Sequence, residues 1–371
     1  RCFRDEDLRA DRQPEFTQVD MELSFVDIDD VIDVNERLLQ ALFKEILDVD
    51  VQLPIPRMTW QEAMDRYGSD KPDTRFGLEL VNLNHIVADV DFAVFKNALE
   101  AHGHVKGINV VAQAQEFSRK KIDNLTEIAK TYKAKGLAWL KVSEAGVQGP
   151  IAKFFTEEQM NTLLTAMNAK ENDLLLFVGD PKYEVVCDSL AAIRNYLGKE
   201  LKLYDPSTFD FLWVVDFPMF EIDEHDKIQF SHNPFSMPQG GLDALENQNP
   251  LDILAYQYDL VCNGIELSSG AVRNHDISIM VKAFEMAGYT EEEVKTKFGA
   301  LYTAFQFGAP PHAGIAPGVD RMLMLLTDSD SIKEVIAFPL NSKAEDLMMG
   351  APGNVNKDQL RDVHIKIDIK K

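Results

Sequence analysis

The stretch Gln18-Val19-Asp20-Met21-Glu22-Leu23-Ser24-Phe25 (residues 18–25) alternates polar and apolar side chains without a break. A period of two predicts a β-strand with one face in a core, here Val19, Met21, Leu23 and Phe25. Upstream, Arg4 and Glu6 lie two residues apart and share a face if that segment is also extended. The start of the chain therefore predicts a hairpin with a long charged loop, whose polar face carries Arg4, Glu6, Gln18, Asp20 and Glu22.

The polar face of this hairpin has two interpretations. A solvated sheet face is the ordinary one for an arbitrary strand pair. A ligand site is favoured by the crowding of an arginine with carboxylates and amides, a combination that suits a small charged ligand. Phe16, at the exit of the charged loop, offers a surface on which a planar base could stack.

The length, composition and net charge of the chain restrict the class of protein. Its 371 residues suggest two or three domains with ample core. A hydrophobic share of 45% and a charged share of 27% are ordinary for a globular protein. The net charge of −23 argues against a generic basic surface for nucleic acid, so RNA contact would need a local basic patch.

Cysteine usage and hydropathy indicate a cytoplasmic protein. Cys2, Cys187 and Cys262 are scattered, which suggests a reducing compartment and neither a disulfide framework nor a zinc site. No apolar run approaches the roughly 18 residues that span a bilayer, and the charged N-terminus is not that of a signal peptide. Because the chain starts with Arg1 inside a strand pattern, we expect a fragment that lacks an N-terminal part.

The character of the sequence changes between residues 78 and 203, where strand-like runs alternate with helical stretches. This order predicts a separate α+β domain. The expected organisation is therefore 1–77 and 204–371 as two parts of one domain, with 78–203 between them. One helix in the middle part is basic, and a solvated face is a better interpretation of it than an RNA site; its lysines are Lys120, Lys121, Lys130, Lys133 and Lys135.

The dipeptide Asn263-Gly264 predicts a two-residue hairpin turn. Val261 then faces Glu266, and Asp259 shares their face as a diagonal neighbour about 7–8 Å away. Two such carboxylates could hold one hard cation, with phosphate oxygens as its other ligands. The alternative is a pair of solvated acids, but apolar neighbours crowd them and like charges this close need a counter-charge.

Several motifs resemble those of class II aminoacyl-tRNA synthetases, and most closely the bacterial-type aspartyl-tRNA synthetases. Phe3-Arg4-Asp5-Glu6 with Phe16 and Asp20 resembles the second class motif. Gly318-Val319-Asp320-Arg321, before an apolar helix, matches the third. The run from Ser69 to Arg75 resembles one that borders the family's active site, and 78–203 stands where bacterial members carry an extra domain.

This resemblance implies an α+β class II fold: an antiparallel sheet flanked by helices, with an inserted α+β domain. It also implies an enzyme that activates L-aspartate with ATP and Mg²⁺ and transfers it to the 3' end of tRNA(Asp), with tRNA(Asn) as an open second acceptor. The family is homodimeric. Its first motif and its N-terminal anticodon-binding barrel are not found in these residues.

The same resemblance assigns the site residues. Arg4 and Arg321 are the expected catalytic residues, with Arg4 on the α-phosphate, Glu6 on the adenine edge, and Phe16 and Arg321 on the two faces of the base. The residues expected to bind ATP are Arg4, Asp5, Glu6, Gln13, Phe16, Glu266, Gly318, Val319, Asp320 and Arg321. Those expected to bind aspartate are Arg4, Gln18, Asp20, His232 and Arg273, and those for the metal are Asp259 and Glu266. Asn233 stands where the family has a second histidine.

Arg273 raises a question of strand parity. It lies seven residues after Glu266, and an odd offset puts it on the opposite face of a regular strand. The family places this arginine on the substrate carboxylate, in the same site. We therefore expect a bulge at Ser268-Ser269-Gly270 that resets the parity.

Three other functions are compatible with parts of this pattern. An asparaginyl-tRNA synthetase or an ammonia-dependent asparagine synthetase would share the ATP site, but neither is expected to carry the 78–203 domain. A non-catalytic RNA-binding paralogue is disfavoured because Arg4, Glu266, Arg273 and Arg321 are intact. The favoured hypothesis requires three arginines and two acids, far apart in sequence, to meet around one magnesium-bound triphosphate.

Overall fold

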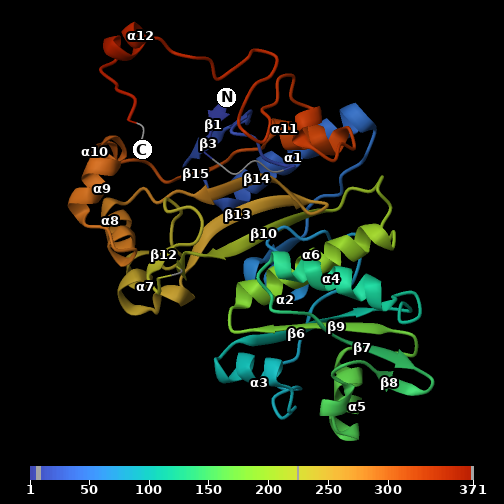
Figure 1. Cartoon of the computed structure of the whole chain (residues 1–371). Helices are drawn as coiled ribbons and strands as arrows, with labels where there is room; N and C mark the ends of the chain where they lie inside the picture. The colour runs from blue at the N-terminus through green and yellow to red at the C-terminus, as the bar shows by residue number, and fades with distance from the viewer. Residues whose placement is uncertain (6–9, 224, 369–371) are drawn as a thin grey trace. The chain divides into compact units, whose positions relative to one another are not determined.

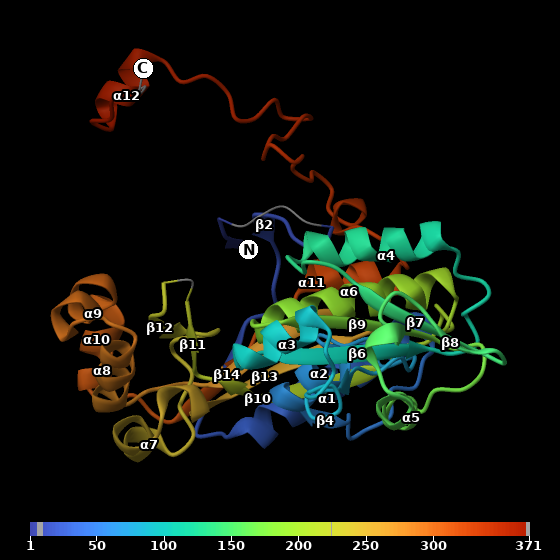
Figure 2. The same cartoon turned by 60° about the horizontal axis from the view of Figure 1, so that its bottom comes forward.

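The computed structural model describes residues 1–5, 10–223 and 225–368. It divides the chain into two compact units: residues 1–21 with 316–371, and residues 22–315. Figures 1 and 2 show the course of the chain through both. Among the described residues, no helix is long and apolar enough to cross a membrane.

A six-stranded sheet forms the core of the larger unit, in the order β3-β15-β14-β13-β10-β4. Antiparallel pairing joins β10 to β13, β13 to β14 and β14 to β15. The strand β4 pairs with β10 in parallel. This is the predominantly antiparallel sheet that the resemblance implied. The strands are β3 (Met21–Ser24), β4 (Arg57–Thr59), β10 (Phe211–Pro218), β13 (Leu254–Cys262), β14 (Ile265–Val272) and β15 (His312–Ile315).

Helices cover both faces of this sheet. The helix α1 (Ile28–Leu47) covers one face, where the rings of Phe43 and Phe211 meet edge-on at 5.1 Å and Trp213 Nε1 donates to Glu36 Oε1 at 3.0 Å. The short helix α2 (Trp60–Tyr67) covers the other face, where Leu212 of β10 and residues of this helix belong to one hydrophobic cluster. Residues of β10 thus alternate between two cores, which explains its nearly continuous apolar sequence.

A second sheet lies between β4 and β10 in the sequence and forms most of residues 78–203, here called the inserted segment. Its five strands run in the order β5-β6-β9-β7-β8. Helices α4 and α6 cover one face and α3 and α5 the other (Figure 1). The elements are β5 (Val81–Asn82), α3 (Ala93–Glu100), β6 (His104–Val110), α4 (Arg119–Thr131), β7 (Ala138–Ser143), β8 (Gly146–Gln148), α5 (Glu157–Ala166), β9 (Leu174–Asp180) and α6 (Tyr183–Glu200).

The central strand β9 shows why both faces are covered. Leu174 and Leu176 pack under α4 and α6, whereas Leu175 and Phe177 pack against α3 and α5. Every side chain of this apolar run is therefore buried, on one side or the other. The α+β character of residues 78–203 is as expected, and the domain boundaries at 78 and 203 stay a prediction.

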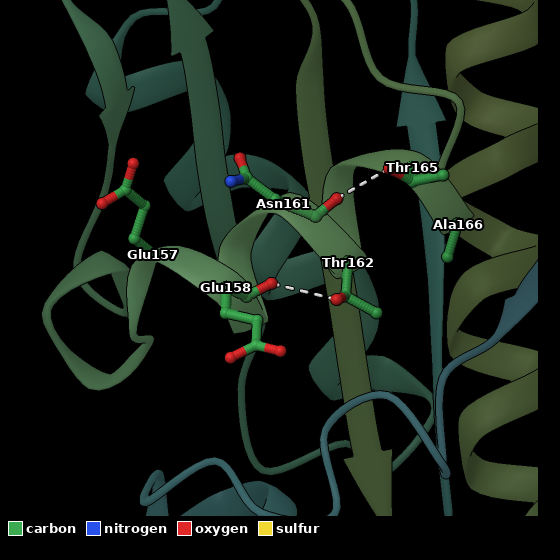
Figure 3. A pocket seen from close by; sticks show the side chains of 6 residues that line it. All are labelled: Glu157, Glu158, Asn161, Thr162, Thr165 and Ala166. Atoms are coloured by element: carbon green, nitrogen blue, oxygen red, sulfur yellow. Dashed lines mark hydrogen bonds between the residues drawn. The ribbon is translucent and has the colours of Figure 1, made fainter.

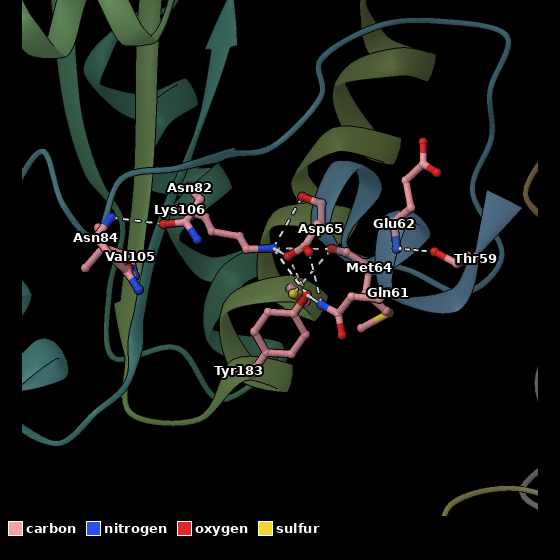
Figure 4. A network of polar contacts seen from close by, with 11 residues as sticks. Thr59, Gln61, Glu62, Met64, Asp65, Asn82, Asn84, Val105, Lys106 and Tyr183 are labelled. Carbon is pink, nitrogen blue, oxygen red and sulfur yellow. Dashed lines mark hydrogen bonds and ion pairs between the residues drawn. The ribbon is translucent and has the colours of Figure 1, made fainter. Parts of the chain in front are cut away.

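A buried lysine joins the inserted segment to helix α2 (Figure 4). Lys106 of β6 is completely buried, and its Nζ lies 2.8 Å from Asp65 Oδ1 and 3.3 Å from the hydroxyl of Tyr183. The same Nζ donates to the carbonyls of Met64 and Asp65 at 3.5 and 3.3 Å. The three donors of this ammonium group are thus fully used.

The remainder of the larger unit is a set of short elements beyond β10. They are β11 (Phe220–Ile222), β12 (Ile228–Phe230), α7 (Gly241–Asn247), α8 (Ile277–Met286), α9 (Glu291–Lys297) and α10 (Gly299–Gln306), with a 3₁₀ turn at Pro250–Asp252. A further 3₁₀ turn, Ala152–Phe154, belongs to the inserted segment.

The smaller unit begins with a hairpin that is shorter than predicted, because the strand at residues 21–24 lies beside β15 and does not pair with the described residues at the start of the chain. Strand β1 (Cys2–Phe3) pairs antiparallel with β2 (Glu15–Phe16), and Arg4 N donates to Pro14 O at 2.9 Å. Its C-terminal part holds α11 (Val319–Leu326), a 3₁₀ turn at Ile332–Glu334 and α12 (Lys357–Asp362).

The alternating stretch at residues 18–25 is only partly a strand. Met21 and Leu23 are half-buried and Glu22 and Ser24 exposed, as predicted. The prediction was wrong at both ends, because Val19 is 41% exposed and Phe25 is 81% exposed. Phe25 has left the strand: its φ is 59°, a left-handed value, and its amide donates to Pro311 O at 2.7 Å.

Candidate active site

The hairpin of β13 and β14 carries the predicted acid pair. Asn263 and Gly264 form its turn with φ values of 54° and 84°, the positive values that a tight hairpin turn requires. Cys262 pairs with Ile265, and Val261 pairs with Glu266. The predicted turn and register are therefore confirmed.

A bulge lies in β14 directly after Glu266. Val261 pairs with Glu266, but the preceding Leu260 pairs with Ser268, so Leu267 is the extra residue. The predicted irregularity is present, one residue before the expected Ser268–Gly270. Because the parity is reset there, Arg273 returns to the face that carries Glu266 and Asp259.

Asp259 is held in an unfavourable environment. Its side chain is 4% exposed, and its Oδ1 has no hydrogen-bond partner among the described residues. Burial, followed by the nearby charge of Glu266, raises the pKa of Asp259 far above its usual range, although the hydroxyl of Ser269 and the ammonium of Lys71 oppose this shift. A carboxyl whose pKa is raised by burial and by a neighbouring like charge is typical of a functional site.

The same two carboxylates fit a divalent cation that takes further ligands from elsewhere. Within the described ranges, no three His, Cys, Asp or Glu side chains converge as a metal site. Asp259 and Glu266 supply hard oxygen ligands, and one of them, Asp259 Oδ1, has no hydrogen-bond partner among residues 1–5, 10–223 and 225–368. Magnesium commonly binds to proteins in this way, through one or two carboxylates with water and phosphate oxygens.

Arg273 is already bound to a carboxylate. Its Nη2 lies 2.6 Å from Glu22 Oε1, and its Nε lies 3.1 Å from the same oxygen. The guanidinium is 19% exposed. Sequence reasoning placed Glu22 on the polar face of the first hairpin but gave it no role in the site, since only the pairing of β3 with β15 brings it next to Arg273.

His232 lies on a segment that adjoins Arg273, because Ser236 forms a bridge with Arg273. Its Nδ1 is 2.9 Å from Ser231 Oγ, and its Nε2 is 3.8 Å from Asp70 Oδ2. Asn233, which replaces the family histidine, accepts the amide of Phe235 at 2.9 Å and so stabilises this turn.

Besides Glu22, two charged residues of the site, Asp70 and Lys71, were missed in the sequence analysis. Lys71 Nζ lies 3.7 Å from Glu266 Oε2 and 3.0 Å from Asp70 Oδ1. Burial opposes ionisation of Asp70, but the nearby imidazole of His232 and the charge of Lys71 lower its pKa to about 2. The signal in the sequence was the Ser69–Arg75 run, whose family counterpart borders the active site.

In the smaller unit, Arg4 and Phe16 lie together. The guanidinium carbon of Arg4 is 5.1 Å from the centre of the Phe16 ring. Asp5 and Asp20 are exposed. Glu6, the residue expected at the adenine edge, lies outside the described residues.

Gln13 and Gln18, the two glutamines expected in the site, have partners within the chain. Gln13 is 3% exposed and its Oε1 accepts the amide of Leu340 at 2.9 Å. Gln18 Oε1 accepts from Cys2 Sγ at 3.3 Å, and its Nε2 donates to Ala316 O at 3.4 Å. Their expected contacts with ATP and aspartate stay predictions.

The third-motif residues form the start of α11. Gly318 is the N-cap and Val319 the first helical residue, and the amide of Val319 donates to Thr17 O at 2.9 Å. Asp320 Oδ2 accepts the amide of Thr17 at 2.7 Å. Arg321 Nε donates to Asp11 O at 3.2 Å. That Arg4 and Arg321 meet Glu266 around one triphosphate stays a prediction, because they belong to different units.

A shallow hollow lies on the outer surface of α5 (Figure 3). The hydroxyls of Thr162 and Thr165 donate to carbonyls of their own helix, those of Glu158 and Asn161, at 2.9 and 2.8 Å. These polar groups are satisfied internally, so the hollow lacks convergent binding groups. A second hollow lies beside the site, where Glu22, Phe305 and His312 are among the lining residues.

Residues 1–342 match the family model described as tRNA synthetases class II (D, K and N). The chain belongs to this family. Its curated relatives include the aspartate–tRNA(Asp/Asn) ligase of Caldanaerobacter subterraneus subsp. tengcongensis, which is 49% identical over 371 residues, or 100% of this chain and 62% of the relative. The aspartate–tRNA ligase of Agathobacter rectalis is 53% identical over 370 residues, or 99% of this chain and 61% of the relative.

The chain thus spans about three fifths of the length of these class II relatives. Among solved structures, an aspartyl tRNA synthetase from Entamoeba histolytica matches with a TM-score of 0.42 and 17% identity. That match covers 91% of this chain and 46% of the solved one.

Proposed function

We propose that the protein is an aspartate–tRNA ligase. In the first step, a carboxylate oxygen of L-aspartate attacks the α-phosphorus of ATP, the bond to the β-phosphate breaks, and pyrophosphate leaves. In the second, a 3'-terminal ribose hydroxyl of tRNA(Asp) attacks the aspartyl carbonyl, and AMP leaves. The proposal is supported by the names of relatives that are 49% and 53% identical across the chain.

The observation that carries the proposal is the orientation of Arg273. Glu22 takes the edge of the guanidinium formed by Nε and Nη2. A guanidinium has a second edge, formed by Nη1 and Nη2, with the same spacing of donors. Glu22 therefore orients the arginine through one edge of the guanidinium. The second edge suits the side-chain carboxylate of aspartate.

The other residues take the roles that the family resemblance gave them. Gln18 and Asp20 would bind the ammonium group of aspartate, and His232 would assist Arg273. Arg4 would meet the α-phosphate, with Arg321 and Phe16 on the base. No side chain need act as a nucleophile, so catalysis would come from positioning and charge stabilisation. The further residues proposed for ATP are Asp5, Glu6, Gln13, Gly318, Val319 and Asp320.

Asp259 and Glu266 would hold magnesium. When bound, this ion supplies positive charge that neutralises phosphate oxygens. The Oδ1 of Asp259, which is buried and has no hydrogen-bond partner in the part of the chain that the structure describes, would be one of its ligands.

Recognition by Arg273 predicts selectivity against asparagine. The amide of asparagine would set N–H groups against the guanidinium donors, and leaving such groups unpaired costs about two orders of magnitude in binding. The test is ATP–pyrophosphate exchange with aspartate, with asparagine and without amino acid. It should use the 371-residue chain and the same chain fused behind the N-terminal part of a curated relative.

We expect exchange with aspartate alone. Arg273→Ala should lower the aspartate-dependent rate by about 100-fold and leave ATP binding unchanged. Arg57→Ala breaks an exposed ion pair with Asp29 on the edge strand β4, which does not pair with either strand of the hairpin; it is the matched control and should change neither. Exchange supported equally by asparagine, or an equal loss of ATP binding in Arg273→Ala, would overturn the proposal.

The whole protein is further proposed to act in the cytoplasm as a homodimer. The free thiols of Cys2, Cys187 and Cys262 are consistent with a reducing compartment. The curated relatives carry both the Asp and the Asp/Asn names, so tRNA(Asn) should be assayed beside tRNA(Asp).

A further inference from the structure

A row of alternating charges runs along the loop that follows α2. His232 Nε2 lies 3.8 Å from Asp70 Oδ2, Asp70 Oδ1 lies 3.0 Å from Lys71 Nζ, and Lys71 Nζ lies 3.7 Å from Glu266 Oε2. Asp259 lies behind Glu266, with an oxygen that has no hydrogen-bond partner among the described residues. Lys71 therefore brings a positive charge to the acid pair from outside the β13–β14 hairpin.

This loop is fixed by helix α6 of the inserted segment. Arg194 is 1% exposed, and its guanidinium donates to the carbonyls of Phe76, Asp73 and Gly77 at 2.6, 2.8 and 3.1 Å. The same group lies 4.0 Å from the centre of the Phe76 ring. Burying a guanidinium is costly, and here its donors are directed to the backbone of the loop.

The other end of the loop is fixed by the same helix. Gly68 ends α2 with a φ of 70°, and a Cβ at this position would come within 2.5 Å of Cys187 O in α6. The backbone of residues 68–77 thus touches α6 at both ends. A displacement of α6 would carry Lys71 with it.

We propose that Lys71 is a positioning residue that balances the charge of Asp259 and Glu266 until a divalent cation binds, and that Arg194 of the inserted segment sets its place. The inference deepens the proposed function, since the divalent cation that accompanies a nucleoside triphosphate is the expected ligand of that pair. Lys71 and the cation then compete for the same carboxylates. The inserted segment would thereby tune the cation affinity of the site.

The test is a titration of the 371-residue chain with Mn²⁺ alone, followed by the electron paramagnetic resonance signal of the free ion. The specific component is the binding that Asp259→Asn removes. Lys71→Met should tighten this component by about tenfold, because a repelling charge near Glu266 is removed. Lys71→Arg keeps the charge and should retain the wild-type affinity.

Lys44→Met is the matched control. Lys44 also lies against two carboxylates, those of Asp48 and Asp50 at 2.7 and 3.1 Å, but on α1. This variant should leave the specific component unchanged. If Arg194 acts through Lys71, Arg194→Met should tighten Mn²⁺ binding in the same direction, and adding it to Lys71→Met should have no further effect.

An unchanged or weaker specific component in Lys71→Met overturns the proposal, and so does the absence of any component that Asp259→Asn removes. If Arg194→Met fails to fold, the single-site variants of Lys71 still decide. Mn²⁺ binding needs neither aspartate nor tRNA. A missing aspartate-dependent exchange with the expected Lys71 effect would therefore refute the proposed function alone, and the reverse result would refute this inference alone.

Discussion

Two ionic clusters, one that contacts helix α2 and one that contacts the loop after it, differ in how completely their charges are satisfied. Lys106 reaches Asp65, the hydroxyl of Tyr183 and two carbonyls, so each donor of its ammonium group has a partner (Figure 4). The pair Asp259 and Glu266 has an oxygen without a hydrogen-bond partner among the described residues, and a lysine 3.7 Å away.

This difference indicates a structural role for the cluster around Lys106 and a ligand-binding role for the pair Asp259 and Glu266. A satisfied cluster joins two elements and needs no further ligand. An unsatisfied pair of like charges opposes folding and is retained where a ligand completes it. Substitutions should therefore act in opposite directions on the two clusters.

The largest effect on stability is expected at Asp65. Asp65→Asn leaves the ammonium of Lys106 buried without its carboxylate and should lower the free energy of unfolding by about 2 kcal/mol. This is below the usual cost for a fully buried pair, because the Asp65 side chain is 47% exposed. Urea unfolding measures it.

Lys106→Met sharpens this prediction. It removes the buried member and leaves Asp65 half-exposed to water, so it should cost only about 1 kcal/mol. The substitution of the more exposed partner should thus be the more harmful one. An equal cost, or a larger cost for Lys106→Met, would contradict this account of the cluster.

The opposite sign is expected at Asp259. Asp259→Asn removes a buried charge that faces Glu266, so it should raise the free energy of unfolding by about 1 kcal/mol. Asp173→Asn is the control: Asp173 is 2% exposed but accepts hydrogen bonds from Ala112 N, Lys170 N and Asn109 Nδ2 at 2.8, 2.9 and 2.9 Å. Asp173→Asn should lower the free energy of unfolding. If Asp259→Asn lowers it as well, the predicted difference between the two clusters is wrong.

The acid hairpin was more predictable than its surroundings. Asn263-Gly264 fixes the register of β13 and β14 through backbone conformation alone, so Asp259 and Glu266 could be placed on one face from the sequence. The odd offset between Glu266 and Arg273 predicted a bulge in the strand. It did not predict the position of the bulge, because any residue after Glu266 could be the extra one. The structure puts it at Leu267.

Contacts between distant segments could not be predicted. Glu22 meets Arg273 across 251 positions of sequence, and Lys71 meets Glu266 through a loop whose carbonyls accept hydrogen bonds from Arg194. The exposed Phe25 shows a further limit: alternation predicted a buried face, but the chain turns at that residue with a φ of 59°. Periodicity reports local pattern and does not report where a strand ends.

The smallest expected effect is a dependence on pH at the satisfied cluster. Burial opposes ionisation of Asp65, but its hydrogen bonds from Lys106, Gln61 and Tyr183 outweigh this and lower its pKa. A carboxyl whose pKa is lower in the folded protein adds stability above its unfolded pKa of about 3.9, and that stability is lost as the pH falls through the folded value. The stability difference between wild type and Asp65→Asn should therefore be constant from pH 7 to about pH 5 and shrink below about pH 4. Urea unfolding across this range measures it, and in a Lys106→Met background the difference should be nearly independent of pH. A difference that grows toward acid would mean that Asp65 is protonated more readily when folded, and Lys106 would then be no counter-charge to it.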